Sequence, residues 1–440
     1  MDKQELKIDN SLKLYQRAIE IIPGASQTNS KRPQGFAPGA FPIYLERGEG
    51  CRVWDVDGNE YIDYIMALGP INLGYAYPRV NAAIKEQVDK ASIVSLLHPL
   101  EVELVEEIIS AVPCAEMARF MKSGAEATSA CVRVARAYTG REQVLHCGYH
   151  GWHDTFTAGS ANPKGVPKAL QGLIRSFGYN DLDGLAKILK EKGDQIACII
   201  MEARTPPVEG FLEGVRSLAD QYGIVLIFDE IVTGFRLALG GAQEYHNVTP
   251  DLAAFGKSMS NGLPLAAFLG KREIMQIAED LVISTTYGNE ALSLAAGLAT
   301  IRELKEKNVF EHTWKMGQKL MDGWLGLGDE LGLPLSVNGL APIGAFDFNL
   351  DDAQRTYGLS ERPLLKQDIW TLFLQEAALR GVLFRRGGLN FISFSHKDED
   401  IQLTLDVCRE VLEIIKSALA KDDVAARLQT WDIRQVKSKA

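Results

Sequence analysis

The chain has 440 residues, of which 46% are hydrophobic and 24% charged, and its formal net charge is -10. This length is ample for one large and one smaller domain. An acidic chain is a poor partner for nucleic acid or an anionic membrane, because both bind basic surfaces. We therefore expect a small-molecule partner.

The N-terminus and the cysteines indicate where in the cell the protein works. The opening stretch MDKQELKIDNSLKLYQRAIEIIPG is charged and lacks the apolar core of a signal peptide. No uninterrupted apolar run approaches the roughly 18 residues of a membrane span. The six cysteines form no C-x-x-C pair and lack partners at zinc-ligand spacing. We expect a cytoplasmic protein with reduced thiols and no metal site.

The first predicted elements are a helix and a small sheet. Residues Asn10 to Ile22 are predicted to form a helix that ends at Pro23-Gly24. After a loop rich in Gly, Pro and Ser, the stretch IYLERGEGCRVWDVDGNEYIDYI alternates apolar and polar residues around two glycine turns. This pattern predicts a small antiparallel meander.

From about residue 80 to 300, helical stretches alternate with short apolar runs. These runs are ARFMKS, QVLHCG, ACIIMEA, GIVLIFDEI, LAAFGK and LAAFLG. Continuous apolar strands separated by helices indicate a mainly parallel sheet that is buried on both faces. Beyond residue 304, longer amphipathic helices flank the strand-like stretch GVLFRRGGLNFISFS.

These patterns predict an α/β fold with a large domain, whose mainly parallel sheet is sandwiched by helices, and a smaller α+β domain from both chain ends. We place the N-terminal part of the small domain at 1–65, the large domain at 66–303 and the C-terminal part of the small domain at 304–440.

Two charged residues follow apolar strands of the predicted sheet. Open parallel sheets bind ligands beyond the carboxyl ends of their strands. Asp229 ends the run GIVLIFDE, and Lys257 follows LAAFG in an otherwise uncharged stretch. A lysine in a desolvated cleft is a nucleophile toward aldehydes, and a buried carboxylate needs a cation or a ligand. A solvated lysine and a turn-capping aspartate are the structural alternatives.

Two further segments follow strands in the same way. Ser123-Gly124-Ala125 precedes a helix, whose first amides suit a phosphate, although an ordinary Ser N-cap has the same pattern. GYHGWHD, residues 148–154, offers two histidines for a metal ion or Tyr149 for stacking on a planar ligand. Pyridoxal 5'-phosphate (PLP) would use a phosphate site, an aromatic face, a carboxylate and a lysine together.

The sequence resembles the class III PLP-dependent aminotransferases of fold type I, and among them the glutamate-1-semialdehyde 2,1-aminomutase-like branch. The motifs that carry the resemblance are WDVDGNEYIDYI, SGAEATSACVRVARAYTGR, GYHGWHD, GVPKAL, FDEIVTGFRLALGGAQEYHNVTPDL, FGKSMSNGLPLAAF, TTYGNEALSLAAGLATI and EDIQLTL. They span nearly the whole chain. The resemblance implies an enzyme that transfers an amino group with PLP as cofactor.

The resemblance also implies roles for single residues. Lys257 would form the Schiff base with PLP and Asp229 would hold the pyridinium nitrogen. The phosphate would bind at Ser123, Gly124 and Ala125. By resemblance, Tyr149 would stack on the ring, Ile231 would pack on its other face, and Glu202 would lie near the ring or substrate. Thr285 would reach the phosphate of a neighbouring subunit in a homodimer.

The expected reaction moves an amino group from an amine or amino acid to a ketone or aldehyde. Lys31 and Arg32 would bind an anionic group of the substrate, with a solvated basic turn as the alternative. An arginine that many class III enzymes use for the substrate carboxylate is replaced by Ser393, and Glu202 is followed by ARTPPVEG in place of a PVAGNMG-like turn.

The alternative function is an intramolecular 2,1-aminomutase of the glutamate-1-semialdehyde type. The acceptor stays open among a sugar-like or cyclic ketone, a β-keto acid and an ω-aldehyde.

Overall fold

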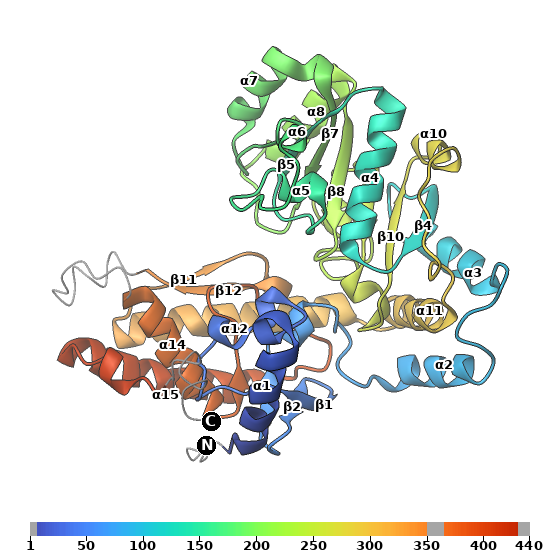
Figure 1. Ribbon diagram of the computed structural model, residues 1–440. Helices are drawn as coiled ribbons and strands as arrows, with labels where there is room; N and C mark the ends of the chain where they lie inside the picture. The colour runs from blue at the N-terminus through green and yellow to red at the C-terminus, as the bar shows by residue number, and fades with distance from the viewer. Residues whose placement is uncertain (1–6, 350–364, 430–440) are drawn as a thin grey trace. The chain divides into compact units, whose positions relative to one another are not determined.

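The computed structural model describes residues 7–349 and 365–429 and divides the chain into two compact units (Figure 1). Unit 1 comprises residues 1–68, 73–77 and 311–440, and unit 2 comprises residues 69–72 and 78–310. The domain ranges 1–65, 66–303 and 304–440 stay predictions, and their residues 1–6, 350–364 and 430–440 lie outside the described part.

Unit 2 is built around a seven-stranded sheet. Its strands in spatial order are β4 (Met117–Met121), β10 (Ala266–Gly270), β9 (Leu252–Phe255), β8 (Val225–Glu230), β7 (Ile196–Met201), β5 (Gln143–Cys147) and β6 (Ile174–Ser176). β10 is antiparallel to both of its neighbours, and the other pairs are parallel. Every residue of β7, β8, β9 and β10 is buried, as expected for apolar strands covered on both faces. All six predicted strands are confirmed.

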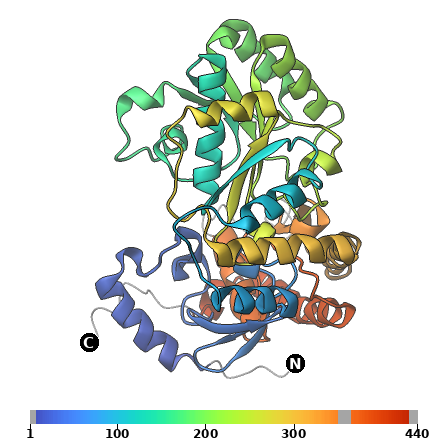
Figure 2. The ribbon, with the colours of Figure 1, turned by 90° about the vertical axis from the view of Figure 1, so that its right-hand side faces the viewer.

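The helices of unit 2 alternate with these strands. They are α2 (Pro78–Val88), α3 (Pro99–Ile109), α4 (Gly124–Thr139), α5 (Asp154–Thr157), α6 (Lys168–Gln171), α7 (Leu182–Lys192), α8 (Phe211–Tyr222), α9 (Ala242–Tyr245), α10 (Arg272–Met275) and α11 (Ala291–Glu306). α4 crosses β7, β8, β9 and β10 and is visible along the sheet in Figures 1 and 2. Its buried side chains are Ala, Cys, Val and Thr, and this small size permits close packing on the sheet.

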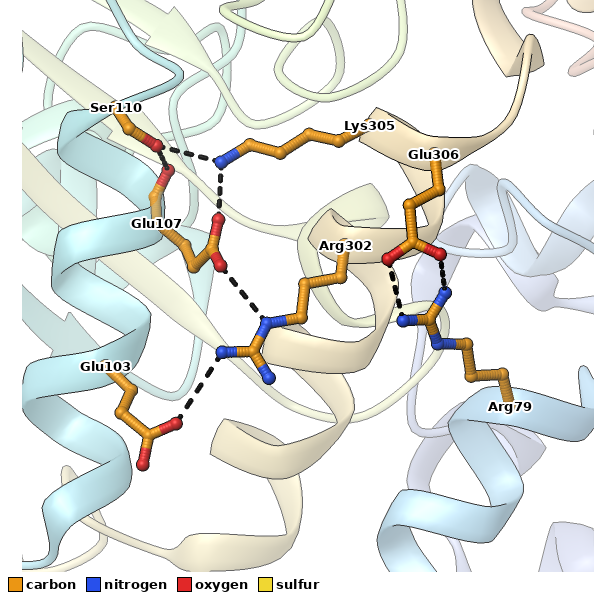
Figure 3. Close-up of polar contacts among 7 residues, drawn as sticks. All are labelled: Arg79, Glu103, Glu107, Ser110, Arg302, Lys305 and Glu306. Carbon is orange, nitrogen blue, oxygen red and sulfur yellow. Dashed lines mark hydrogen bonds and ion pairs between the residues drawn. The ribbon is translucent and has the colours of Figure 1, made fainter.

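Ion pairs join α11 to the two helices beside it (Figure 3). Arg302 Nε lies 3.1 Å from Glu107 Oε1 on α3, and Lys305 pairs with the other oxygen of the same carboxylate. On α2, Arg79 Nη2 donates to Glu306 Oε1 at 2.9 Å. Because one carboxylate pairs with two cations, α3 and α11 are joined by a small network rather than by an isolated pair.

Unit 1 combines segments from both ends of the chain. Its elements are α1 (Asp9–Ile21), β1 (Leu45–Glu49), β2 (Arg52–Asp55), β3 (Glu60–Asp63), most of α12 (Val309–Leu331), β11 (Leu335–Asn338), β12 (Ala345–Phe348), α14 (Leu365–Ala378), β13 (Val382–Leu383) and α15 (Asp398–Lys421). β1, β2 and β3 form the predicted antiparallel meander. β13 adds to it in parallel with β3, which unites the two chain ends in one sheet.

The strand expected within GVLFRRGGLNFISFS is much shorter than predicted. Only Val382 and Leu383 form a strand, and the segment NFISFS forms none. The backbone amides of this segment donate to separate acceptors, Phe391 to Tyr64 O at 2.7 Å and Ile392 to Pro342 O at 3.1 Å. Phe391 and Ile392 are buried, but their backbone does not follow one neighbouring strand.

The expected fold class is confirmed, since the large mainly parallel sheet with its helices matches fold type I transaminases. Within the described ranges, no helix combines the length and apolar character that a membrane crossing requires.

Candidate active site

Three neighbouring strands of unit 2 bring the predicted charged residues to one edge of the sheet. In register, Met201 pairs with Phe228, and Glu230 pairs with Phe255. Glu202, Asp229 and Lys257 therefore lie at the same end of the sheet, just beyond β7, within β8 and just beyond β9. Their common edge is the one at which open α/β sheets bind ligands.

Lys257 begins a short 3-10 turn, Lys257–Ser260, directly after β9 and Gly256. Its φ of 40° is unusual for a residue with a side chain, and such backbone costs on the order of 1 kcal/mol. The next three side chains are buried, and Ser258 Oγ donates to Gly69 O at 3.3 Å. The turn is thus fixed at its base, while Lys257 itself is half-buried.

Asp229 is held by two donors in a buried setting. His150 Nδ1 lies 2.7 Å from Asp229 Oδ2, and the Ile231 amide donates to Oδ1 at 3.1 Å. Both side chains are almost fully buried. The pairing of His150 with Asp229 is a residue role that the sequence did not predict, because 79 positions separate the two.

The start of α4 lies beside these groups. Ser123 is the N-cap and forms a capping box with Glu126, so the ordinary capping interpretation is confirmed. Gly124 and Ala125 are the first helical residues, whose amides have no acceptor within the helix. A methyl group at Gly124 would lie 3.0 Å from Ile231 Cδ1, and one at Gly256 would lie 3.2 Å from the same atom. Ile231 therefore connects the helix start to the lysine turn.

Glu202 and Tyr149 are linked through the backbone. The Tyr149 amide donates to Glu202 Oε2 at 3.1 Å, and Gly148 has a φ of 116°. A Cβ at position 148 would lie 2.5 Å from Glu202 Oε2, so glycine permits the close approach. The Tyr149 side chain is 72% exposed in unit 2 and is open to a planar ligand.

The second histidine of GYHGWHD has a separate partner. His153 Nδ1 lies 2.9 Å from Ser129 Oγ on α4. His150 and His153 thus belong to different hydrogen-bonded pairs. Within residues 7–349 and 365–429, no group of three or more His, Cys, Asp or Glu side chains is placed to hold a metal ion.

Comparison with known proteins decides the family. A sequence model described as Aminotransferase class-III matches residues 36–419. The chain belongs to the class III aminotransferase family. This aminotransferase is 37% identical over 429 residues to a 3-aminobutyryl-CoA aminotransferase of Cloacimonas acidaminovorans, covering 94% of this chain and 100% of that protein.

Two other similarities agree with this assignment. A glutamate-1-semialdehyde 2,1-aminomutase of Syntrophobacter fumaroxidans is 34% identical over 435 residues, covering 94% of this aminotransferase and 99% of that protein. A solved structure described as a transaminase with PLP bound is 25% identical with a TM-score of 0.85, covering 94% and 99% of the two chains. Class III aminotransferases use PLP, so the predicted family, enzyme class and cofactor are confirmed.

The residues of unit 2 fit this cofactor. The edge offers an amine at Lys257, a buried carboxylate at Asp229, helix amides at Gly124 and Ala125, and the exposed ring of Tyr149. Amine, anion site and carboxylate are the three groups that PLP requires of its protein. The individual roles of these residues stay predictions.

Thr285 lies elsewhere in unit 2 of the aminotransferase. It lines a cavity of about 480 Å³ together with Leu97 and Val102 from α3 and its approach, and with Phe120 on β4. Several large apolar side chains near this cavity are exposed, namely Leu96, Leu97, Val102, Val282 and Tyr287.

The two predicted substrate-binding cations lie in unit 1 and differ in their surroundings. Lys31 lines a cavity of about 440 Å³ with aromatic residues such as Phe36 and Phe41. The Arg32 guanidinium packs on the Gly24 turn, where a Cβ would lie 2.8 Å from Nη2. Lys31 therefore faces an open space, whereas Arg32 covers a turn of its own segment.

Proposed function

We propose that this class III aminotransferase transfers an amino group from an amine or amino acid to a ketone or aldehyde, with Lys257 holding PLP. The observation that carries the proposal is the common edge shared by Lys257, Asp229 and the first amides of α4. When bound, PLP supplies an aldehyde carbon for the amine and a ring that accepts electrons from the reacting bonds.

The protein residues supply binding and proton transfer. Gly124 and Ala125 amides bind the phosphate at the positive end of α4. The Asp229 carboxylate holds a proton on the ring nitrogen, and His150 keeps that carboxylate oriented. The Lys257 amine would remove the proton from the carbon that carries the donor nitrogen and return it later.

Replacement of the lysine tests the proposal. We expect Lys257→Ala to lose turnover and the visible absorption of the bound cofactor while keeping its circular dichroism spectrum. Lys190→Ala, at an exposed lysine of α7, is the matched control and should retain both. Steady turnover by Lys257→Ala would exclude the proposed role.

An intramolecular aminomutase is the second candidate, and it is favoured by the relatives named glutamate-1-semialdehyde 2,1-aminomutase. A mutase needs no separate acceptor and keeps the nitrogen on one carbon skeleton. Incubation of the purified enzyme with a ¹⁵N-labelled donor and an unlabelled acceptor separates the two functions, since label in the acceptor product requires amino transfer.

We also propose a homodimer in which Thr285 contacts the phosphate of the neighbouring subunit. The support is the group of exposed large apolar side chains around the Thr285 cavity, since such clusters mark protein–protein interaction sites. A second copy of the chain would cover Leu96, Leu97 and Tyr287. The phosphate bound at Gly124 and Ala125 would then also accept a hydrogen bond from the Thr285 hydroxyl of the partner.

A further inference from the structure

The turn between β7 and α8 carries an arginine beside the site. Arg204 lies two residues after Glu202, in the stretch ARTPPVEG. The turn is anchored on both sides of Arg204, because His246 Nε2 lies 3.2 Å from Ala203 O and Tyr179 Oη donates to Thr205 O at 2.7 Å. The position of Arg204 is therefore set by the backbone.

The guanidinium of Arg204 is only partly used by the protein. Its Nε lies 3.3 Å from Glu202 Oε1, and the other oxygen of Glu202 accepts from the Tyr149 amide. In the described part of the chain, this ion pair is the polar contact found for the guanidinium, whose side chain is 35% exposed. Glu202 thus holds the Nε side of the group and leaves the fork of Nη1 and Nη2 open.

Two neutral side chains, Cys147 and Tyr179, also lie near the Arg204 guanidinium. Burial raises the pKa of Cys147 to about 11 and of Tyr179 to about 12, with Arg204 acting against both shifts. Both side chains are therefore uncharged at neutral pH and do not satisfy the cation. An arginine fork of this kind matches the two oxygens of a carboxylate.

The distance to the reacting groups suits a substrate. β7, β8 and β9 are consecutive strands, and their register places Glu202 level with Ala254, three residues before Lys257. Two strand spacings and three residues of rise separate the Glu202 and Lys257 backbones by on the order of 14 Å, a gap that their side chains and a small substrate can span. Ser393, which stands where many relatives are expected to have an arginine for this purpose, is fully buried and bonded to His396 Nδ1 at 3.0 Å. Ser393 supplies no cation to an anionic substrate.

We propose that Arg204 binds a carboxylate of the amino donor or its keto product through Nη1 and Nη2, positioned by Glu202 at Nε. The inference rests on the proposed aminotransferase function and assigns its substrates to the amino and keto acids. The proposed anion site belongs to unit 2, whereas Lys31 and Arg32 belong to unit 1.

Two donors that differ in one group test the assignment. 3-Aminobutyrate and 2-aminobutane share their carbon chain, but only the former has a carboxylate. The loss of visible absorption of the bound cofactor is followed as a function of donor concentration. For Arg204→Gln we expect the half-saturating concentration of 3-aminobutyrate to rise about 10- to 100-fold, because a hydrogen bond between charged groups is lost. For 2-aminobutane it should stay within about twofold.

Two control variants distinguish a loss of carboxylate binding from a general disturbance of the fold. Arg204→Lys should lie between the wild type and Arg204→Gln, because it keeps the charge but loses the fork. Arg272→Gln removes an exposed arginine of α10 and should match the wild type. An equal change for both donors in Arg204→Gln, or none for 3-aminobutyrate, overturns the inference.

Two unreactive ligands test the carboxylate site independently of the proposed aminotransferase activity. Calorimetry of 3-hydroxybutyrate and 2-butanol with the cofactor-loaded enzyme measures binding without turnover. Binding of 3-hydroxybutyrate that weakens at least about tenfold in Arg204→Gln supports the carboxylate site even if no donor reacts. Donor turnover by a wild-type enzyme that does not bind 3-hydroxybutyrate would instead retain the function and exclude the site.

Discussion

His150 Nδ1 lies 2.7 Å from Asp229 Oδ2, and both side chains are buried at the end of β8. A carboxylate oxygen accepts hydrogen bonds, so the Nδ1–H group of His150 is the donor and Asp229 Oδ2 is the acceptor. With the Ile231 amide on the other oxygen, the carboxylate has one orientation. A carboxylate fixed in this way is prepared to receive a proton-bearing ring nitrogen.

Removal of this donor should reduce catalysis. We expect His150→Phe to lower kcat/KM about 10- to 100-fold, which corresponds to the loss of one hydrogen bond to a charged group. His153→Phe is the matched control on the same loop, since His153 pairs with Ser129. Steady-state kinetics of both variants, with cofactor content measured by absorbance, checks this. Equal losses in the two would show that the loop matters only for folding.

The buried His396 should make unit 1 sensitive to acid. Burial lowers the pKa of His396 to about 4, whereas an unfolded histidine titrates near 6.5. Between these values the unfolded chain binds a proton that the folded chain does not, so stability is complete above about pH 6.5 and falls as the pH decreases toward 4. The full difference is on the order of 3 kcal/mol.

His396→Asn tests this prediction, because its amide oxygen can still accept from the Ser393 amide. Urea unfolding followed by circular dichroism at several pH values should show a smaller decrease below pH 6.5 in this variant than in the wild type. Parallel pH profiles would contradict the prediction, and the comparison at pH 8 corrects for any constant loss of packing.

A charge on the proposed interface should separate the subunits. Leu97 is 86% exposed and lines the Thr285 cavity. We expect Leu97→Glu to convert the dimer to a monomer in light scattering and to lower cofactor affinity, since Thr285 would no longer reach a neighbour. Ile21→Glu is the control, because Ile21 on α1 is 75% exposed and belongs to unit 1. A wild-type monomer with full activity would exclude the homodimer.

The network between α3 and α11 should contribute modestly to stability. Glu107→Gln removes the charge that pairs with Arg302 and Lys305, and we expect a loss of about 1 kcal/mol at low salt. In 1 M salt the loss should decrease by about half, because screening acts within a few ångströms. Glu86→Gln breaks an exposed pair with Lys90 and should leave stability almost unchanged at either salt concentration. A loss that is independent of salt would indicate packing instead.

Much of the site could be predicted because its residues follow apolar strands. GIVLIFDE and LAAFGK give both a buried strand and the charged residue that leaves it, so Asp229 and Lys257 were identifiable without a structure. His150 was visible only as part of an aromatic and histidine-rich loop. Its partner is 79 residues away, and no local pattern distinguishes a hydrogen bond to Asp229 from metal binding or stacking.

NFISFS shows the opposite case, since its apolar residues favoured a strand that the structure does not form. Burial follows from side-chain character, which is local, whereas a strand needs one continuous neighbour for its backbone. Here the acceptors come from Tyr64 and Pro342, which are far apart in the sequence. The open fork of Arg204 was likewise not predictable from the sequence, because it depends on Glu202 contacting Nε and not Nη1 or Nη2.

By itself, the sequence determined the α/β architecture, the family, the cofactor and the lysine and aspartate at the strand ends. This was possible because runs of apolar residues indicate which strands are buried and in which order they follow along the chain. Only the tertiary structure decided which groups hold Asp229, that Ser123 caps α4, and that Arg204 keeps a free fork beside Glu202. These relationships depend on the register of β7 and β8 and on glycines such as Gly148 that permit close approach. Strand register places side chains from distant positions within a few ångströms, and no local pattern encodes that distance.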